Sequence, residues 1–187
     1  AVVYEEKLEQ LETAFDVLKH AFGIDYANEA TSAQIERIAT AADKWTELLE
    51  EYNEIVEGLE DATEQCELRV KIGRWYGEHT GAPDLGIQSL NAALELNPES
   101  VNALRELSNF HRRGGDSVAL AETLTKIVPL EQDPEIQTQT LLELAQVQET
   151  ALQDSTSSIQ SYRQALDLDD ESEVALDALS RLYEASA

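Results

Sequence analysis

Basic residues are scarce in this sequence: 13 Lys and Arg stand against 38 Asp and Glu in 187 residues, so the formal net charge is −25. A surface of this sign repels phosphate backbones and anionic lipid headgroups. We therefore predict that the chain binds neither nucleic acid nor membrane. The apolar share of 42% is enough for a folded core and excludes wholesale disorder.

Cysteine and methionine are scarcer still. The single cysteine, Cys66, excludes an intrachain disulfide, which fits a reducing compartment and favours the cytoplasm. No methionine occurs and the first residue is Ala, so we expect the sequence to be a segment of a longer gene product. No apolar run reaches the length of a membrane span, and no basic-then-apolar leader opens the chain.

The residue sets that carry catalysis or hold metals are missing too. His20, His79 and His111 are scattered, without cysteines or paired carboxylates at the spacing of a metal site. The acidic stretch 167–172 lacks the glycine of a calcium loop, and no phosphate-binding glycine loop occurs. We predict no enzymatic activity, no metal and no cofactor.

What the sequence does contain is a repeat. One segment recurs at an interval of 72 residues, as FDVLKHAFGIDY (15–26), IQSLNAALELNP (87–98) and IQSYRQALDLDD (159–170). Sliding the chain by 72 preserves chemical character without a gap. The aligned positions include Ala21, Ala93 and Ala165, and also Leu18, Leu90 and Tyr162.

Each 72-residue block divides into two units, and each unit into two helices. Apolar residues spaced by three and four, as in Leu141, Leu144 and Ala145, indicate helices, and no alternating strand pattern occurs. An all-α fold follows from this pattern.

Turn residues separate the predicted helices. Pro83 and Pro98 are each expected to start a helix, and Pro129 to stop one. In RRGGD (112–116), glycine ends one helix and Asp116 caps the next.

The pattern resembles that of the tetratricopeptide repeat (TPR) superfamily over essentially the whole chain. That family has small residues at repeat positions 8 and 20, an aromatic at 11, a large residue at 24, Ala at 27 and Pro at 32. In the third unit, allowing one extra residue between its helices, positions 8, 11, 20, 24, 27 and 32 fall on Gly73, Tyr76, Gly86, Leu90, Ala93 and Pro98. In the fifth unit they fall on Ala145, Gln148, Ser158, Tyr162, Ala165 and Asp170. The main departures are Glu36, where a small residue is usual, and Gln148, where an aromatic is usual.

The resemblance implies a right-handed α-α superhelix (solenoid) of antiparallel helix pairs. A helix pair cannot bury its own apolar face, so stacked copies supply one another with a core. We expect one array over 1–187, with a partial unit at 1–28, units at 29–64, 65–100, 101–136 and 137–171, and a terminal helix at 172–187. The terminal helix either caps the array with polar residues or marks a point where the array continues, and we favour the second.

In TPR arrays the first helices of the units line the concave wall, at positions 2, 5, 9 and 12. Position 9 of successive units carries a hydrogen-bond donor: Arg37, Arg74, Asn109, Gln146 and Arg181. Arg105 and Arg112 share a helix face with Asn109, because residues three and four positions apart lie together. We call these seven residues the donor row.

Two interpretations of the donor row are open. In one, the arginines hold the carboxylate or an acidic side chain of an extended peptide in a groove. In the other, they offset the glutamates that surround them. The aromatic residues Trp45, Trp75 and Tyr76 form either a cage or part of the core, and we favour the core.

The sequence thus predicts a non-catalytic scaffold that binds a protein or peptide segment in the concave groove. The alternative is a structural spacer or self-assembly segment of a longer array, which associates through its exposed ends. The acidic surface would favour a basic partner through electrostatic steering, although solubility and helix propensity explain the glutamates equally well.

Overall fold

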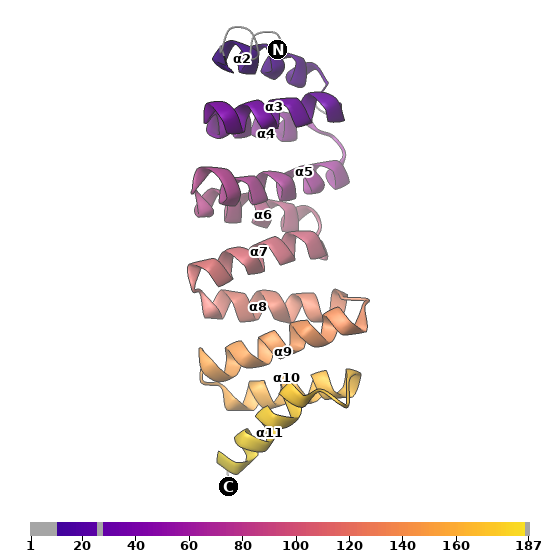
Figure 1. Ribbon diagram of the computed structural model, residues 1–187. Coiled ribbons are helices and arrows are strands. Elements are labelled where there is room, and N and C mark those ends of the chain that lie inside the picture. Colours follow the sequence, from indigo (N-terminus) through magenta and orange to yellow (C-terminus); the bar gives the residue numbers. More distant parts are fainter. Residues whose placement is uncertain (1–10, 26–27, 186–187) are drawn as a thin grey trace. The chain divides into compact units, whose positions relative to one another are not determined.

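The computed structural model describes residues 11–25 and 28–185. Nearly all of these residues are helical, and no strand occurs among them. The chain divides into two compact units, 1–98 and 99–187, each of which is a stack of short helices joined by tight turns (Figure 1). The all-α helical-repeat prediction is therefore confirmed.

The first unit contains α2 to α6. Their bounds are α2 Leu11–Ile24, α3 Glu29–Ala42, α4 Trp45–Gly58, α5 Ala62–Trp75, a π-helical segment η1 Tyr76–Thr80, and α6 Pro83–Leu96. Each helix contacts the next one along the chain, and Figure 1 shows them stacked in sequence order. The buried faces of α2 to α5 form one apolar cluster.

Aromatic rings make up much of this core. Tyr52 lies between Phe22 and Trp75, with ring centroids 4.5 Å and 4.8 Å away. Trp45 stacks on His79 with centroids 3.8 Å apart and lies 5.5 Å from Trp75. The two tryptophans are only 6% and 4% exposed, so the preference for core packing is confirmed for both.

The extra residue predicted between the helices of the third unit is taken up by η1. At Trp75 the chain passes from α5 directly into the π-helical segment Tyr76–Thr80, and a π-turn accommodates one inserted residue without breaking a helix. Gly81 ends the segment with a φ of 63°, in the left-handed region that glycine adopts without strain. The insertion thus lengthens the first helix, and Tyr76 packs against the core from within it.

The second unit contains α7 to α11. Their bounds are α7 Val101–Gly114, α8 Ser117–Ile127, a 3₁₀ segment η2 Val128–Leu130, α9 Pro134–Thr150, α10 Ser155–Leu168 and α11 Glu173–Ala185. Here too each helix contacts its successor. Towards the C-terminal end, Ala145, Tyr162, Ala178 and Leu182 belong to one apolar cluster that joins α9, α10 and α11.

Most turn predictions hold. Pro83 begins α6, and Pro129 lies in η2, directly after α8 ends. Gly115 closes α7 with a φ of 72°, and the Asp116 carboxylate accepts a hydrogen bond from the Ala119 N–H at the start of α8.

The prediction that Pro98 starts a helix is wrong. Helix α7 begins at Val101, and its cap is Ser100, whose hydroxyl accepts a hydrogen bond from the Ala103 N–H. Pro98 lies in the preceding turn. The fixed φ of proline suits a turn as well as a helix start, and the serine two residues later supplies the stronger start signal.

The two departures from the TPR pattern are both hydrogen-bonded across a helix pair. Glu36 on α3 accepts from the Tyr52 hydroxyl of α4 at 3.3 Å. Gln148 on α9 accepts from the Ser161 hydroxyl of α10 at 2.8 Å. Burial and the neighbouring Glu36 charge both raise the pKa of Tyr52, so its hydroxyl stays a donor. A polar side chain thus joins the two helices at each of these positions.

The predicted division into units stays a prediction. Part of the unit at 1–28 lies outside the described residues, which omit 1–10, 26 and 27. Helices α5 and α9 begin at Ala62 and Pro134, each three residues before the predicted boundaries at 65 and 137. The single array over 1–187 likewise remains an expectation beside the two compact units.

Candidate functional site

The donor row lies on the first helices of the predicted units. In the first unit, Arg37 is exposed on α3 and Arg74 on α5. In the second unit, the row continues on α7, α9 and α11, with Arg105, Asn109, Arg112, Gln146 and Arg181. All of these side chains are exposed except that of Asn109, which is half-buried. The arginines of the second unit do not point into empty solvent, however.

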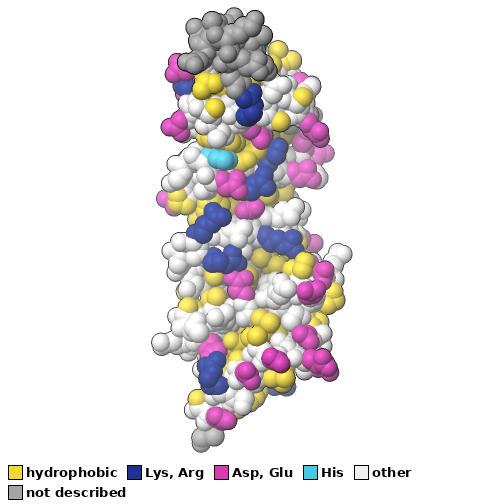
Figure 2. Space-filling model, viewed as in Figure 1, with side chains coloured by type: hydrophobic (Ala, Val, Ile, Leu, Met, Phe, Trp, Pro, Cys, Tyr) yellow, Lys and Arg dark blue, Asp and Glu magenta, His cyan; other side chains and the backbone are white. Residues whose placement is uncertain are grey.

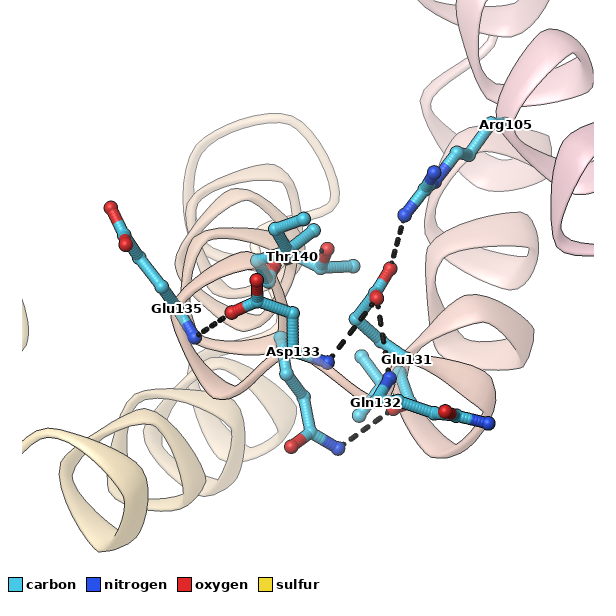
Figure 3. A network of polar contacts seen from close by, with 9 residues as sticks. Arg105, Glu131, Gln132, Asp133, Glu135 and Thr140 are labelled. Carbon is cyan, nitrogen blue, oxygen red and sulfur yellow. Dashed lines mark hydrogen bonds and ion pairs between the residues drawn. The ribbon is translucent and has the colours of Figure 1, made fainter.

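Arg105 reaches from α7 to the loop before α9, where it donates to the Glu131 carboxylate (Figure 3). The Glu131 side chain is only 9% exposed. It also accepts hydrogen bonds from the backbone N–H groups of Gln132 at 3.2 Å and Asp133 at 3.5 Å. Asp133 in turn caps α9 by accepting from the Glu135 N–H at 2.9 Å. Arg105 is thus part of the turn that starts α9.

Arg112 makes a two-pronged contact with Glu143 of α9. Its Nε and Nη2 donate to the two carboxylate oxygens at 2.8 Å and 3.0 Å, the geometry that gives arginine–carboxylate pairs their strength. Its Nη1 donates to the Asn109 side-chain oxygen at 2.7 Å. Arg112 and Asn109 therefore point together as predicted, whereas Arg105 bonds elsewhere.

Arg181 on α11 donates through both Nη atoms to Glu149 of α9. Glu149 also accepts from the Tyr162 hydroxyl of α10 at 3.1 Å, so one carboxylate joins three helices. The Arg181 guanidinium, and after it the Tyr162 hydroxyl, lower the pKa of Glu149. Burial, followed by the charge of Glu149, raises the pKa of Tyr162 to about 12. The group is therefore an ion pair with a neutral phenol at ordinary pH.

Ion pairs between helices also occur in the first unit. Lys19 of α2 lies 3.4 Å from Glu51 of α4, and Arg69 of α5 lies 2.8 Å from Glu57 of α4. In the donor row, Arg74 near the end of α5 lies 4.0 Å from Glu78 of η1, the segment that follows directly. Figure 2 shows Lys and Arg side chains beside Asp and Glu on the face in view. Five basic residues of the described part thus join acidic elements that are separate in the sequence: Lys19, Arg69, Arg105, Arg112 and Arg181.

A groove of about 600 Å³ lies between α9 and α11 in the second unit, with Tyr162 of α10 on its wall. Seven lining residues occupy the positions that line TPR grooves, 2, 5, 9 and 12: Gln139, Leu142, Gln146 and Glu149 on α9, and Val174, Asp177 and Arg181 on α11. Two of the seven, Gln146 and Arg181, belong to the donor row. The structure therefore brings part of the row into a concave site.

The groove combines apolar contact surface with free polar groups. Leu142, Val174 and Ala178 supply the apolar part, and Val174 is 61% exposed. The Asp177 carboxylate and the Gln146 amide have no hydrogen-bond or ion-pair partner within the described part of the chain. These groups are available to a ligand, whereas Arg181 is already engaged.

The acidic members of this site were missed by sequence reasoning. Glu149 lies at position 12 of its unit and Asp177 at position 5 of the next, so the same rule that selected the row also places them on the wall. The donor row contains hydrogen-bond donors alone, so these two acceptors fall outside it. Glu131 lies in a loop, outside the helical repeat positions that predict the wall, so the repeat pattern does not identify it.

The described residues contain no cluster typical of a metal centre. No group of three or more His, Cys, Asp or Glu side chains there could hold a metal ion. The Cys66 thiol is buried and donates to the Ala93 carbonyl at 3.4 Å. None of the described helices has both the length and the apolar character needed to cross a membrane.

Comparison with known protein families finds no matching family model, and no curated protein matches the chain in sequence. Solved structures do match. A crystal structure of MamA is 16% identical, covers 79% of this chain and 82% of that chain, and gives a TM-score of 0.54. A second MamA structure is 14% identical, with coverages of 96% and 84% and a TM-score of 0.54.

A third match is YrrB, described as a TPR protein with an unusual peptide-binding site. It is 15% identical, with coverages of 93% and 86% and a TM-score of 0.53. Identities this low establish the fold alone. Together with the helix pairs and the small residues at their crossings, they show that this chain has the helical-repeat fold of TPR proteins, as its sequence predicted.

Proposed function

We propose that the protein is a non-catalytic scaffold whose second unit binds a segment of a partner protein in the groove between α9 and α11. The observation that carries this proposal is the groove itself, whose lining falls on the positions that face the ligand in TPR proteins. A further support is the fold shared with YrrB, which has a peptide-binding site of its own. Protein or peptide partners are proposed, and neither nucleic acid nor membrane.

The remaining donor-row residues are proposed as further contacts, each within its own unit. Arg105, Asn109 and Arg112 lie on α7 of the same unit, and Arg37 and Arg74 lie on the corresponding helices of the first unit. In this proposal the exposed parts of these side chains contact the partner. The guanidinium groups of Arg105 and Arg112 stay bound to Glu131 and Glu143. The groove residues supply most of the binding.

The test is selection of linear peptides from a random display library on the chain, followed by anisotropy titration of the selected peptides. Gln146→Trp fills the groove from an exposed position and is expected to abolish binding. Gln160→Trp is the matched control, because Gln160 is exposed on α10 and does not line the groove. Equal affinities for the two variants would remove the groove from consideration.

A second function, self-assembly through the end of the stack, is favoured by one observation on α11. Leu176 is 48% exposed, whereas the residue at the same repeat position of α9, Leu141, is 2% exposed and lies in a helix that α10 contacts. The face of α11 that a second helix would cover is thus open, and the proposed occupant is a second copy of this chain. Light scattering over a range of concentrations tests it: Leu176→Glu should abolish any association, and a strictly monomeric wild type would refute it.

A further inference from the structure

The donor-row arginines of the second unit are poorly placed to receive an acidic ligand, because Arg105, Arg112 and Arg181 are each paired with a glutamate. Arg112 directs Nε and Nη2 to Glu143, and Arg181 directs both Nη atoms to Glu149. Each paired contact occupies two of the five N–H donors of the guanidinium and offsets its positive charge. An incoming carboxylate therefore meets an arginine whose charge a glutamate of the fold already offsets.

The groove lining itself carries a net negative charge. Glu143, Glu149 and Asp177 face a single cation in the lining, Arg181. Two of these carboxylates are paired, which leaves Asp177 as a charge without a partner among the described residues. Beside it lie apolar Leu142 and Val174. The chain as a whole carries a net charge of −25, which attracts cations to its surface and repels anions.

We infer that the segment bound in this groove is basic and amphipathic, with apolar side chains against Leu142, Val174 and Ala178 and a Lys or Arg at Asp177. The inference rests on the proposed function of the groove and specifies its ligand. It reverses the ligand charge expected from the arginines in the sequence, because their pairing with glutamates leaves Asp177 as the open charge. The amide of Gln146 is then free to bond the backbone of the bound segment.

Two synthetic peptides test the inference directly. They share the same Leu and Ala residues, and one carries Lys where the other carries Glu. We expect the lysine peptide to bind and the glutamate peptide not to bind in anisotropy titrations at low and at physiological salt. Asp177→Asn is expected to lower the affinity for the lysine peptide about two- to five-fold, the range for one exposed charge pair.

The matched control is Asp84→Asn, which removes the same charge from an exposed site on α6 of the first unit. It is expected to leave the affinity unchanged. Equal weakening by both variants would mean a non-specific attraction to an acidic surface and would overturn the inference.

The two peptides also distinguish failure of this inference from failure of the proposed function, peptide binding in the groove. Binding of the glutamate peptide, blocked by Gln146→Trp, would leave the groove as the binding site and overturn its basic ligand. Failure of both peptides would overturn the inference as well. If the library selection also yielded no peptide sensitive to Gln146→Trp, the proposed function would fail with it.

Discussion

At the scale of single residues, a close approach of helices α5 and α6 depends on the absence of a methyl group at Gly73. Gly73 of α5 faces α6, and a Cβ there would lie 2.6 Å from Leu90 Cγ and 3.1 Å from the Gly86 carbonyl oxygen. Leu90 is fully buried, so it has no room to swing aside. The small residues that the repeat pattern demands at these positions are thus a steric requirement of the pair.

Gly73→Ala is therefore expected to destabilise the protein by about 1–2 kcal/mol, the overpacking cost less the gain in helix propensity. Urea denaturation followed by circular dichroism measures it. Gly58→Ala is the control in the same unit, because a Cβ there would meet nothing within 4 Å. It should be neutral or stabilising by up to about 1 kcal/mol. A Gly73→Ala protein as stable as wild type would show that α5 and α6 are not in close contact.

The pair of Glu149 and Arg181 should make stability depend on pH. Because Arg181 lowers the pKa of Glu149 below its ordinary 4.5, the pair stabilises the folded state fully above that value. Its contribution is lost as the pH falls through the lowered folded-state value. A double-mutant cycle with Glu149→Gln and Arg181→Gln should therefore give a favourable coupling at pH 7 that disappears in strong acid.

The control for this cycle is Glu184→Gln, which removes an exposed α11 carboxylate that has no ion-pair partner in the described structure. Its stability should follow that of the wild type across the same pH range, apart from a constant offset. A Glu149–Arg181 coupling of equal size at both pH values would contradict the assignment of the ion pair.

At the scale of helices, the sequence predicts the elements well because their signals are local. Apolar spacing and cap residues lie within a few positions of the helix that they specify, as with Asp116 at the start of α8. The donor-row helices were predicted for the same reason. What could not be predicted were the partners of the row, because Glu143 lies 31 residues from Arg112 and no local pattern links them. The π-helical conformation of η1 could not be predicted either, because an inserted residue can be accommodated in a turn or in a helix.

Helices α4 and α6 begin without a side-chain cap, after Lys44 and Ala82 respectively. The backbone at Ala82, with φ −108° and ψ 70°, is close to that at Asp154, with φ −96° and ψ 83°. Asp154 accepts a hydrogen bond from the Ser157 N–H from this conformation. A capping side chain at 82 is therefore compatible with the existing backbone.

Ala82→Ser is expected to stabilise the protein by about 1 kcal/mol, because the hydroxyl accepts from one of the first free N–H groups of α6. Thermal melting should show a rise of about 2–4 °C. The control is Ala33→Ser at an exposed interior position of α3, which should cost about 0.5 kcal/mol through lower helix propensity. A loss of stability in both variants would mean that α6 does not begin at Pro83.

At the scale of the whole molecule, the excess of acidic over basic residues opposes folding. With 38 acidic and 13 basic residues, even complete pairing leaves 25 carboxylates that repel one another, and such repulsion destabilises a compact state. The ion pairs between helices, such as Arg69–Glu57 and Arg112–Glu143, offset only part of it. Salt weakens both effects, because the screening length falls from about 10 Å at 0.1 M to about 3 Å at 1 M.

Since the unpaired carboxylates outnumber the pairs, screening should remove more repulsion than attraction, and sodium chloride should raise the melting temperature at pH 7. Each kcal/mol of repulsion removed corresponds to about 2–4 °C, which circular dichroism at 222 nm resolves. The same titration at pH 4 is the control, because partial protonation of the carboxylates lowers the net charge and should shrink the effect of salt. A melting temperature that falls with salt at pH 7 would mean that the bridges between helices contribute more to stability than the surplus charge subtracts.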